Sequence, residues 1–289
     1  MKIIKYFFEA LIIYLFFLII KILGLKNSRK IFSFIFIKVG PLIKSKKIVE
    51  ENIFRVFGNQ IDSKQITKSM WSNYGKTFVE YLFLKKYRDD SFKEKQIEIK
   101  GLETLIKIKK NKNPVIFISG HFANFELMSM ELTKNEVNLA TIYRPLNNIF
   151  VNPFMEFLRK KFICKNQIKK GISGIRDSME YLKNKHSIAL MIDQRLSEGK
   201  KLPFFKEGAL TTTLPAQLAL KYNCDIVPVY LKRNSNDTFE LEIYNPIDVS
   251  KMDKNENSKI NISLELNKII EKMILKNPGQ WIWTHNRWK

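Results

Sequence analysis

The sequence predicts an α/β fold, with a mixed central sheet flanked by helices and a long apolar helix at the amino terminus. Short apolar runs rich in β-branched residues alternate along the chain with segments of helical periodicity, which is the pattern of layered α/β domains. The chain has 289 residues and is 45% hydrophobic, enough for one large core. No internal repeat or linker divides it. We therefore expect a membrane anchor helix over residues 1–25 and a single domain over residues 26–289.

The amino-terminal segment, residues 3–23, is almost wholly apolar and long enough to cross a bilayer, since about 20 apolar residues suffice. No small-residue cleavage site follows it, so we do not expect a removed signal peptide. The larger basic cluster follows the segment, at Lys26, Arg29 and Lys30. It favours a transmembrane anchor that leaves the following domain on the cytoplasmic side. A buried or interfacial amphipathic helix is the alternative.

The remaining elements follow from local patterns. Residues 31–42 are apolar but too short for a span, and residues 47–87 have the periodicity of helices. Strands are expected where β-branched and aromatic residues cluster, at 96–100, 115–119, 139–143, 187–192, 226–232 and 238–244. Helices are expected at 101–110, 125–132, 150–162, 174–183, 211–222 and 260–275. Residues 202–213 read as a loop that leads into a helix, and the polar residues 250–258 as a flexible loop.

Charge and motif content restrict the function. The net charge of +22 favours polyanionic partners, such as an acidic protein, an anionic membrane or a phosphorylated substrate. Only nine of the 50 basic residues are arginine, so we do not expect nucleic acid as a partner. Two cysteines, Cys164 and Cys224, supply neither a disulfide framework nor a metal cluster. The sequence holds no GxGxxG, Walker A, HExxH or paired CxxC motif, so we expect no cofactor and no metal.

A histidine and a carboxylate at the end of one strand are the most informative pair. His121 follows the strand 115–119 after a single glycine, and Glu126 comes five residues later. On one straight helix these side chains would lie about 140° apart, because each residue turns the helix by about 100°. If His121 lies on the strand-to-helix turn and Glu126 in the first helical turn, they meet, and the carboxylate orients a general base. A structural histidine is the alternative.

Two further strands also end in polar residues. Tyr143 and Arg144 close one of them, and Asp193 and Gln194 close another. If the three strands are neighbours in one sheet, these residues share a rim with His121, where α/β sheets bind ligands. The Arg144 guanidinium suits a phosphate or a carboxylate, and Asp193 would hold it in place. A purely structural Arg–Asp pair is the alternative.

The last third of the chain offers two more candidate binding segments. Residues 211–213 are three threonines ahead of an expected helix, where they are suited to cap it and to offer backbone N–H groups to an anion. The chain ends in Trp281-Ile-Trp-Thr-His-Asn-Arg-Trp-Lys289, a mixture of aromatic and cationic residues that suits a membrane interface or an anionic headgroup. Core packing of the tryptophans is the alternative.

Six blocks of residues, in order along nearly the whole chain, carry a family resemblance. They are Gly120–Glu126 (GHFANFE), Tyr143–Asn148 (YRPLNN), Gly174–Arg176, Ile192–Gln194, Pro203–Phe205 with Thr212-Thr213, and Pro278–Trp288. In these blocks and in the apolar amino terminus, the chain resembles the late acyltransferases of lipid A biosynthesis, of the lauroyl/myristoyl type. The resemblance implies a glycerolipid-acyltransferase-like fold and an O-acyltransferase activity in lipopolysaccharide or lipooligosaccharide biosynthesis at the cell inner membrane.

The resemblance also implies partners and residue roles. An acyl carrier protein would deliver the acyl thioester, a lipid A precursor would accept it, and inner-membrane lipids would surround the enzyme. His121 would take the proton of the acceptor hydroxyl, with Glu126 orienting it. Arg144 would bind a phosphate or the developing oxyanion. The other expected substrate-binding residues are Asp193, Asn124, Tyr143, Gln194, Thr212 and Arg287. A different glycolipid or phospholipid acceptor, and a basic membrane-tethered binding protein without enzymatic activity, are the alternatives.

Overall fold

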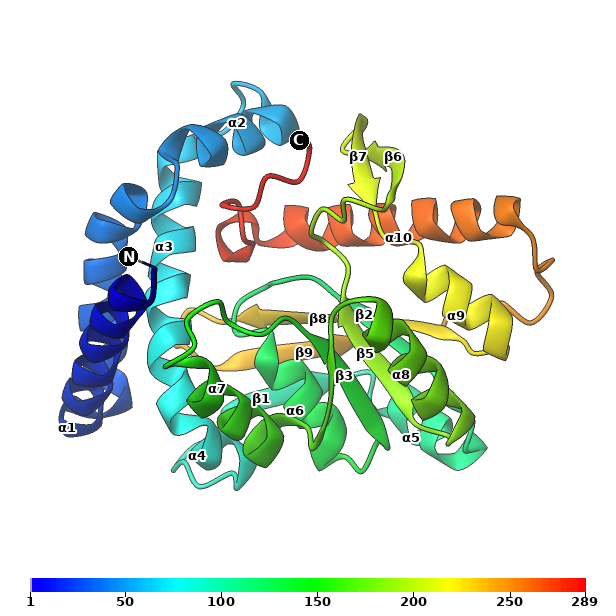
Figure 1. The fold of residues 1–289 in the computed structure, drawn as a ribbon, viewed down its shortest axis with the longest axis horizontal. Coiled ribbons are helices and arrows are strands. Elements are labelled where there is room, and N and C mark those ends of the chain that lie inside the picture. The colour runs from blue at the N-terminus through cyan, green and yellow to red at the C-terminus, as the bar shows by residue number, and fades with distance from the viewer. Residues whose placement is uncertain (1) are drawn as a thin grey trace.

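The computed structural model describes residues 2–289 and is built on one seven-stranded sheet (Figure 1). The strand order is β1-β9-β8-β2-β5-β3-β4. The strands are β1 Ile97–Lys100, β2 Ile116–Ser119, β3 Leu139–Tyr143, β4 Asn166–Lys169, β5 Ser187–Met191, β8 Ile226–Arg233 and β9 Phe239–Ile243. β9 pairs with β8 in the antiparallel sense, and the other neighbouring pairs are parallel. The predicted α/β class with a mixed sheet is therefore confirmed.

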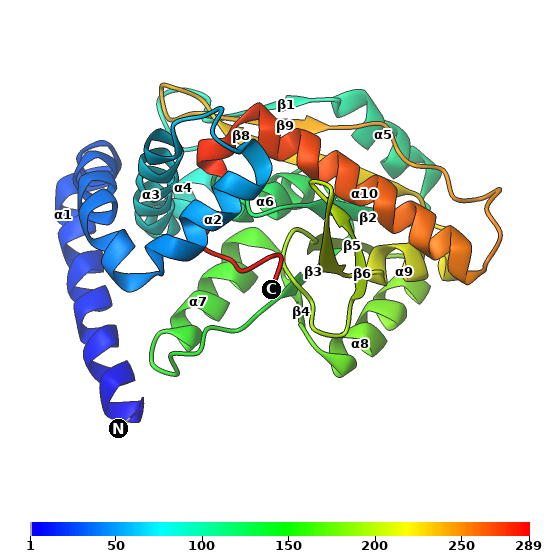
Figure 2. The same cartoon turned by 90° about the horizontal axis from the view of Figure 1, so that it is seen from above.

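Helices cover both faces of the sheet, and each face has its own core (Figure 2). Ile116 and Ile118 of β2 lie in one core, and Phe117 between them lies in the other. This alternation follows from the geometry of a strand, in which successive side chains point to opposite faces. Strands that are buried on both faces read as continuous apolar runs, which is why the sequence predicts the central ones well.

The helices after the amino-terminal segment are α2 Lys46–Phe57, α3 Ser63–Glu80, α4 Leu84–Arg88, α5 Leu102–Asn111, α6 Glu126–Lys134, α7 Asn152–Leu158, α8 Ile172–Lys183, α9 Leu214–Tyr222 and α10 Glu256–Lys276. A π-helical turn at Arg159–Ile163 extends α7, and 3-10 turns at Tyr81–Phe83 and Pro278–Gln280 follow α3 and α10. Side chains of α9 and α10 fill one core, and side chains of α5, α6 and α7 fill the other.

Three strands were not predicted. β4 lies at the edge of the sheet and has too few apolar residues to be recognised. β6 Lys200–Phe204 and β7 Glu207–Thr211 form an antiparallel hairpin where a loop was expected. The turn residues of that hairpin, Phe205 and Lys206, have φ values of 50° and 67°. Such turns usually contain Asn or Gly, so this hairpin leaves no turn signal in the sequence.

The starts of two helices differ from the prediction by more than two residues. α9 begins at Leu214 rather than at residue 211, because Thr211 belongs to β7. α10 begins at Glu256, so the predicted loop over residues 250–258 is wrong at its end. The Asn255 side chain caps this helix by accepting a hydrogen bond from the backbone N–H of Ser258 at 2.9 Å.

The amino-terminal helix α1, Lys2–Ile43, folds back on itself at Gly24 (Figure 1). Gly24 has a φ of 73°, in the left-handed region that glycine adopts without strain. We call residues 2–23 the first arm and residues 25–43 the second arm. By length and composition α1 is the one helix among the described residues that could cross a membrane. The predicted apolar helix is confirmed, whereas its reversal at Gly24 was not predicted.

Both arms of α1 pack on α3. Phe17 of the first arm and Phe32 of the second arm both contact Phe78, with ring centres 5.3 Å and 5.7 Å apart. Arg29 of the second arm is buried and donates from Nε to Glu80 Oε1 at 2.7 Å. The helix α1 is therefore joined to the domain by an aromatic cluster and a buried ion pair.

Candidate active site

Three neighbouring strands bring the predicted polar residues to one edge of the sheet. β2, β5 and β3 lie side by side and run parallel, so their carboxyl ends meet. Ser119 is paired with Met191 in the β2–β5 register. His121 and Asp193 each come two residues beyond this pair. The predicted shared rim is confirmed, and such rims are where α/β sheets bind ligands.

His121 and Asp193 form the central contact of the rim. His121 Nδ1 lies 2.8 Å from Asp193 Oδ1, and the His121 backbone N–H donates to Asp193 Oδ2 at 2.9 Å. The Trp281 indole N–H donates to the same Oδ2 at 2.8 Å. Gly120 permits this close approach, because a Cβ there would lie 2.8 Å from the Phe122 ring and 3.2 Å from Asp193 Cβ. An imidazole, a backbone amide and an indole therefore hold one carboxylate.

The two side chains of this pair differ in exposure. The Asp193 side chain is fully buried, whereas 19% of the His121 side chain is exposed. Burial alone would raise the pKa of Asp193, but the charge and hydrogen bonds of His121 and the Trp281 indole outweigh it and lower that pKa to about 2. Asp193 is therefore a carboxylate at neutral pH. A carboxylate at Nδ1 favours the tautomer with its proton on Nδ1, which leaves Nε2 to accept a proton.

Glu126 lies in the first turn of α6, as predicted, but its contacts differ from the prediction. Its Oε1 accepts hydrogen bonds from Arg159 Nε at 2.8 Å, from Arg159 Nη2 at 2.6 Å and from the Tyr81 hydroxyl at 2.7 Å. Over residues 2–289, His121 is not a hydrogen-bond partner of this carboxylate. The predicted contact between His121 and Glu126 is therefore wrong. A buried guanidinium is costly without a carboxylate partner, and Glu126 is the partner of Arg159 rather than of His121.

Arg159 is a site residue that sequence reasoning missed. It is buried at the π-helical turn after α7, and its Cζ lies 5.6 Å from the centre of the Tyr143 ring. Burial lowers the pKa of Arg159, but the charge of Glu126 outweighs it and raises the pKa overall. Its Nη1 has no partner in the described part of the chain. In the sequence Arg159 precedes Lys160 and Lys161, which is typical of a solvated basic face, so nothing local marks it.

Arg144 follows β3 and is exposed at the rim. The predicted pairing of Arg144 with Asp193 is wrong. The oxygens of Asp193 accept hydrogen bonds from His121 and Trp281, and across residues 2–289 Arg144 is not among their partners. Arg144 is therefore a guanidinium at the edge of the site that is open to solvent.

Three other predicted binding residues also have internal contacts or partial burial. Tyr143 is buried, and its hydroxyl donates to Glu156 Oε1 at 2.7 Å. Gln194 is half-buried directly after Asp193. Thr212 Oγ1 accepts a hydrogen bond from the backbone N–H of Leu214 at 3.3 Å, whereas Thr213, at the N-cap position of α9, makes no capping hydrogen bond through its side chain. No ligand contact is therefore assigned to these three side chains by their geometry alone.

Asn124 is buried and belongs to an internal polar network. Its Nδ2 donates to Glu80 Oε2 at 3.0 Å, and Glu80 also receives hydrogen bonds from Arg29 and Arg233. Burial raises the pKa of Glu80, but the two arginines outweigh it and lower the pKa overall. The network connects the His121 loop to the second arm of α1 and to β8.

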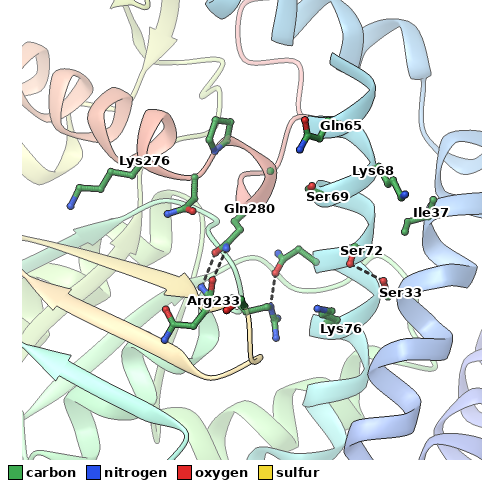
Figure 3. Close-up of a pocket in the computed structure, with 16 residues that line it drawn as sticks. Ser33, Ile37, Gln65, Lys68, Ser69, Ser72, Lys76, Arg233, Lys276 and Gln280 are labelled. Atoms are coloured by element: carbon green, nitrogen blue, oxygen red, sulfur yellow. Dashed lines mark hydrogen bonds between the residues drawn. The ribbon is translucent and has the colours of Figure 1, made fainter. Parts of the chain in front are cut away.

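The loop between β2 and α6 is held from behind by α3 and the turn after α10. Ala123 has a φ of 45°, and its N–H donates to the Gln280 carbonyl at 3.0 Å. The Ala123 carbonyl accepts from Asn73 Nδ2 and from Thr77 Oγ1, both at 3.2 Å. Behind this loop is a cavity of about 790 Å³ between α3, the second arm of α1 and the end of α10 (Figure 3). His121 does not line it.

The cavity is polar and cationic, but its charges are largely neutralised within the protein. Lys76 pairs with Asp237 at 2.6 Å, and Lys276 pairs with Glu242 at 2.6 Å. Gln280 fixes the Arg233 backbone with two hydrogen bonds of 2.7 Å (Figure 3). The cavity is therefore separate from the rim. Two of the residues that line it, Asn73 and Gln280, hydrogen-bond to Ala123 in the His121 loop.

The end of the chain lies in the core. Trp281, Trp283 and Arg287 are at most 1% exposed. Arg287 donates to the Leu210 carbonyl at 2.7 Å and to Thr211 Oγ1 at 2.8 Å. The predicted membrane-interface position is therefore wrong for these side chains, and the alternative, core packing of the tryptophans, is confirmed. Composition alone does not separate the two environments, since both accept aromatic side chains with one polar atom.

Burial lowers the pKa values of two basic groups near Asp193. Burial lowers the pKa of His285 to about 4 and that of Arg287 to about 10. His285 is therefore neutral at pH 7, and Arg287 is still a cation. Asp193 raises the pKa of both groups, but less than burial lowers it.

Residues 2–289 contain neither a candidate metal site nor an activated thiol. They contain no group of three or more His, Cys, Asp or Glu side chains that could hold a metal ion. Cys164 and Cys224 are buried, and burial raises the pKa of both thiols, so neither is an activated nucleophile. The chemistry that this site can perform is proton transfer at His121, with the Arg144 guanidinium exposed at the same edge of the sheet.

Comparison with known proteins gives one family over the whole chain. The family model described as "Bacterial lipid A biosynthesis acyltransferase" matches residues 1–289. The chain is 27% identical over 207 residues to the lipid A biosynthesis palmitoleoyltransferase of Escherichia coli, which covers 69% of this chain and 64% of that protein. It is 24% identical over 196 residues to the lipid A biosynthesis lauroyltransferase of Escherichia coli, which covers 66% of this chain and 61% of that protein.

A similar match is found in a third protein. The lipid A biosynthesis acyltransferase of Haemophilus influenzae is 24% identical over 209 residues, 69% of this chain and 63% of that protein. The chain therefore spans less than two thirds of the length of these curated relatives.

Proposed function

The chain belongs to the bacterial lipid A biosynthesis acyltransferase family, and we propose that it transfers a fatty acyl chain to a hydroxyl group of a lipid A precursor. The observation that carries the proposal is the His121–Asp193 pair at the carboxyl edge of the sheet. The names of the relatives, a palmitoleoyltransferase and a lauroyltransferase of lipid A biosynthesis, support it. An acyl carrier protein is the proposed donor, because a net charge of +22 suits an acidic partner.

The proposed step is a direct acyl transfer assisted by a general base. The acceptor hydroxyl oxygen attacks the thioester carbonyl carbon while His121 Nε2 takes the hydroxyl proton. The carbon–sulfur bond then breaks, an ester remains on the acceptor, and the proton on His121 passes to the leaving thiolate. Asp193 stabilises the imidazolium that forms between these two events. General-base assistance of this kind contributes about 10²–10⁴-fold to the rate.

The guanidinium groups supply the electrostatic part of the proposal. Arg144 is exposed at the rim and is suited to a phosphate of the acceptor. Arg159 is held by Glu126 and keeps Nη1 without a protein partner in the described chain, but this atom is buried, so in this proposal Arg159 acts through its charge and not through direct contact with the substrate. In this proposal Glu126 does not touch His121 and acts as a positioning residue for Arg159.

The proposed setting is the cytoplasmic side of the cell inner membrane, with α1 as the membrane anchor. The exposed apolar first arm of α1 supports a membrane location. Acyl carrier protein is a soluble donor, so the rim must face the compartment that contains it. The same proposal includes a relationship to the glycerolipid-acyltransferase fold, for which the mixed sheet flanked by helices is the supporting feature.

The test is transfer by purified protein supplied with an acyl carrier protein thioester and a lipid A precursor. We expect His121→Ala to lose turnover while it still folds and keeps its membrane association. His186→Ala is the matched control, because His186 lies in the turn before β5, away from the rim, and it should keep full turnover. Transfer by His121→Ala at the rate of the unaltered protein would refute the base assignment.

The acceptor is tested separately, by mass spectrometry of lipid A and of phospholipids from a strain without this gene. Loss of one acyl chain from lipid A is the expected result. If lipid A is unchanged but phospholipids or other glycolipids are altered, the acceptor is one of those lipids and the proposed acyl-transfer chemistry still holds. An unchanged set of lipids would favour a membrane-tethered binding protein instead.

A further inference from the structure

The outer side of the first arm of α1 is exposed and is not covered by any other segment of residues 2–289. Its exposed fractions include 62% for Ile4, 59% for Phe8 and 60% for Leu18. Ala10, Phe17 and Ile20 are buried and mark the side that faces the domain. Exposed apolar surface of this extent indicates a lipid or a protein interface.

The segment that follows β3 is joined directly to this arm. Asn148 Nδ2 donates to the Tyr6 carbonyl at 2.8 Å, and the Tyr14 hydroxyl donates to the Phe150 carbonyl at 2.8 Å. Phe154 of α7 packs against Phe17, with ring centres 5.6 Å apart. These contacts run from residue 6 to residue 17, roughly 16 Å of helix at 1.5 Å per residue. Wherever the first arm enters a membrane, this segment must therefore lie beside it.

The same segment exposes large apolar side chains of its own. We call them the α7 patch; they are Leu146, Ile149, Phe150 and Phe157, with exposed fractions of 39%, 56%, 38% and 52%. The patch lies in the loop before α7 and on α7 itself, on the side of the molecule where the first arm runs (Figure 2). The apolar surface of the first arm thus continues onto the domain.

Cations border the patch. Lys160 and Lys161 are exposed directly after α7, and Lys161 Nζ lies 5.1 Å from the centre of the Phe157 ring. An apolar surface bordered by lysines matches the boundary between acyl chains and anionic headgroups in a bilayer. A soluble protein partner would not explain why the patch continues from the most apolar helix of the chain.

We propose that the α7 patch is a second membrane contact, which inserts into an anionic bilayer next to the first arm. This inference goes beyond the acyl transfer and does not depend on it. The patch begins two residues after Arg144, and the Tyr143 hydroxyl is fixed to Glu156 of α7 at 2.7 Å. Insertion of the patch therefore holds the rim of the candidate site against the membrane surface.

The test uses the full-length protein in vesicles of phosphatidylethanolamine and phosphatidylglycerol. Cys164 and Cys224 are buried, so one introduced surface cysteine can be labelled selectively with an environment-sensitive fluorophore. We expect the fluorescence emission of the label in Ile149→Cys and in Phe157→Cys to shift to shorter wavelengths in vesicles. Most of this emission should be quenched when the lipids carry nitroxide groups. Ile106→Cys is the matched control, since Ile106 of α5 is 57% exposed, and its label should behave as in water.

Equal, water-like emission at all three positions would overturn the proposal. A second measurement tests the cationic border. The double variant Lys160→Glu and Lys161→Glu should reduce the nitroxide quenching at position 149 in phosphatidylglycerol-containing vesicles. The same reversal at Lys107 and Lys110 of α5 should leave the quenching unchanged. If the two double variants behave alike, the lysines do not take part and the anionic part of the proposal is wrong.

Discussion

His121 and Asp193 are joined twice, through the side chain at 2.8 Å and through the backbone N–H of His121 at 2.9 Å. The two hydrogen bonds use both oxygens of one fully buried carboxylate, so the carboxylate fixes the imidazole ring and the loop that carries it. The Trp281 indole completes the arrangement by donating to Oδ2. His121 is therefore positioned by a residue that follows the neighbouring strand β5, 72 positions away in the chain.

The first prediction is that Asp193→Asn lowers kcat by about 10²–10⁴-fold, the usual contribution of an oriented general base. Asparagine keeps the size of the side chain but removes the charge that stabilises an imidazolium. The measurement is steady-state transfer by purified protein, beside Asp177→Asn on the exposed face of α8 as a control. Equal kcat values for the two variants would show that Asp193 has only a structural role.

The second prediction concerns the buried pair of Glu126 and Arg159. Removing either partner leaves an uncompensated buried group, so Glu126→Ala and Arg159→Ala should each lower the free energy of unfolding by about 3–5 kcal/mol. The double variant should lose less than the sum, with a coupling of about 1–3 kcal/mol. Urea unfolding in detergent provides the measurement. Strictly additive losses would mean that the pair does not interact in solution.

The third prediction separates binding from folding at Arg144. Because this side chain is exposed and does not pair with Asp193, Arg144→Ala should change the free energy of unfolding by no more than about 0.5 kcal/mol. It should raise KM for the anionic acceptor, and Arg144→Lys should restore only part of the loss, since one ammonium does not reproduce a planar fork. Lys107→Ala on α5 is the control for a general loss of positive charge. An unchanged KM would remove Arg144 from the binding site.

The fourth prediction follows from the lowered pKa of His285. Between about pH 6.5, the ordinary pKa of histidine, and about pH 4, the folded value, the unfolded chain binds more protons at this residue than the native protein does. The free energy of unfolding therefore falls as the pH drops through this window. His285→Gln removes this titration, so its stability should depend less steeply on pH between 6.5 and 4. Parallel stability profiles for the two proteins would contradict the burial argument.

Local patterns in the sequence were sufficient for most of the elements and for the position of the candidate site. β2 and β5 are apolar runs that are buried on both faces, and each is followed two residues later by a polar side chain, His121 or Asp193, at the same edge of the sheet. The glycine before His121 marks the point where strand gives way to turn. β4 and the β6–β7 hairpin were missed because their sequences lack an apolar run or a turn residue.

Which groups touch was decided by the tertiary structure. The sequence by itself determined that His121 closes a strand, and nearness along the chain pointed to Glu126 as its partner. The order and register of β2 and β5 instead place Asp193 opposite His121, while Arg159, from the turn after α7, takes Glu126. The physical reason is that strand and helix propensities act over a few residues. The desolvation cost of a buried charge, by contrast, is offset by whichever partner the packing of distant segments brings within hydrogen-bond distance.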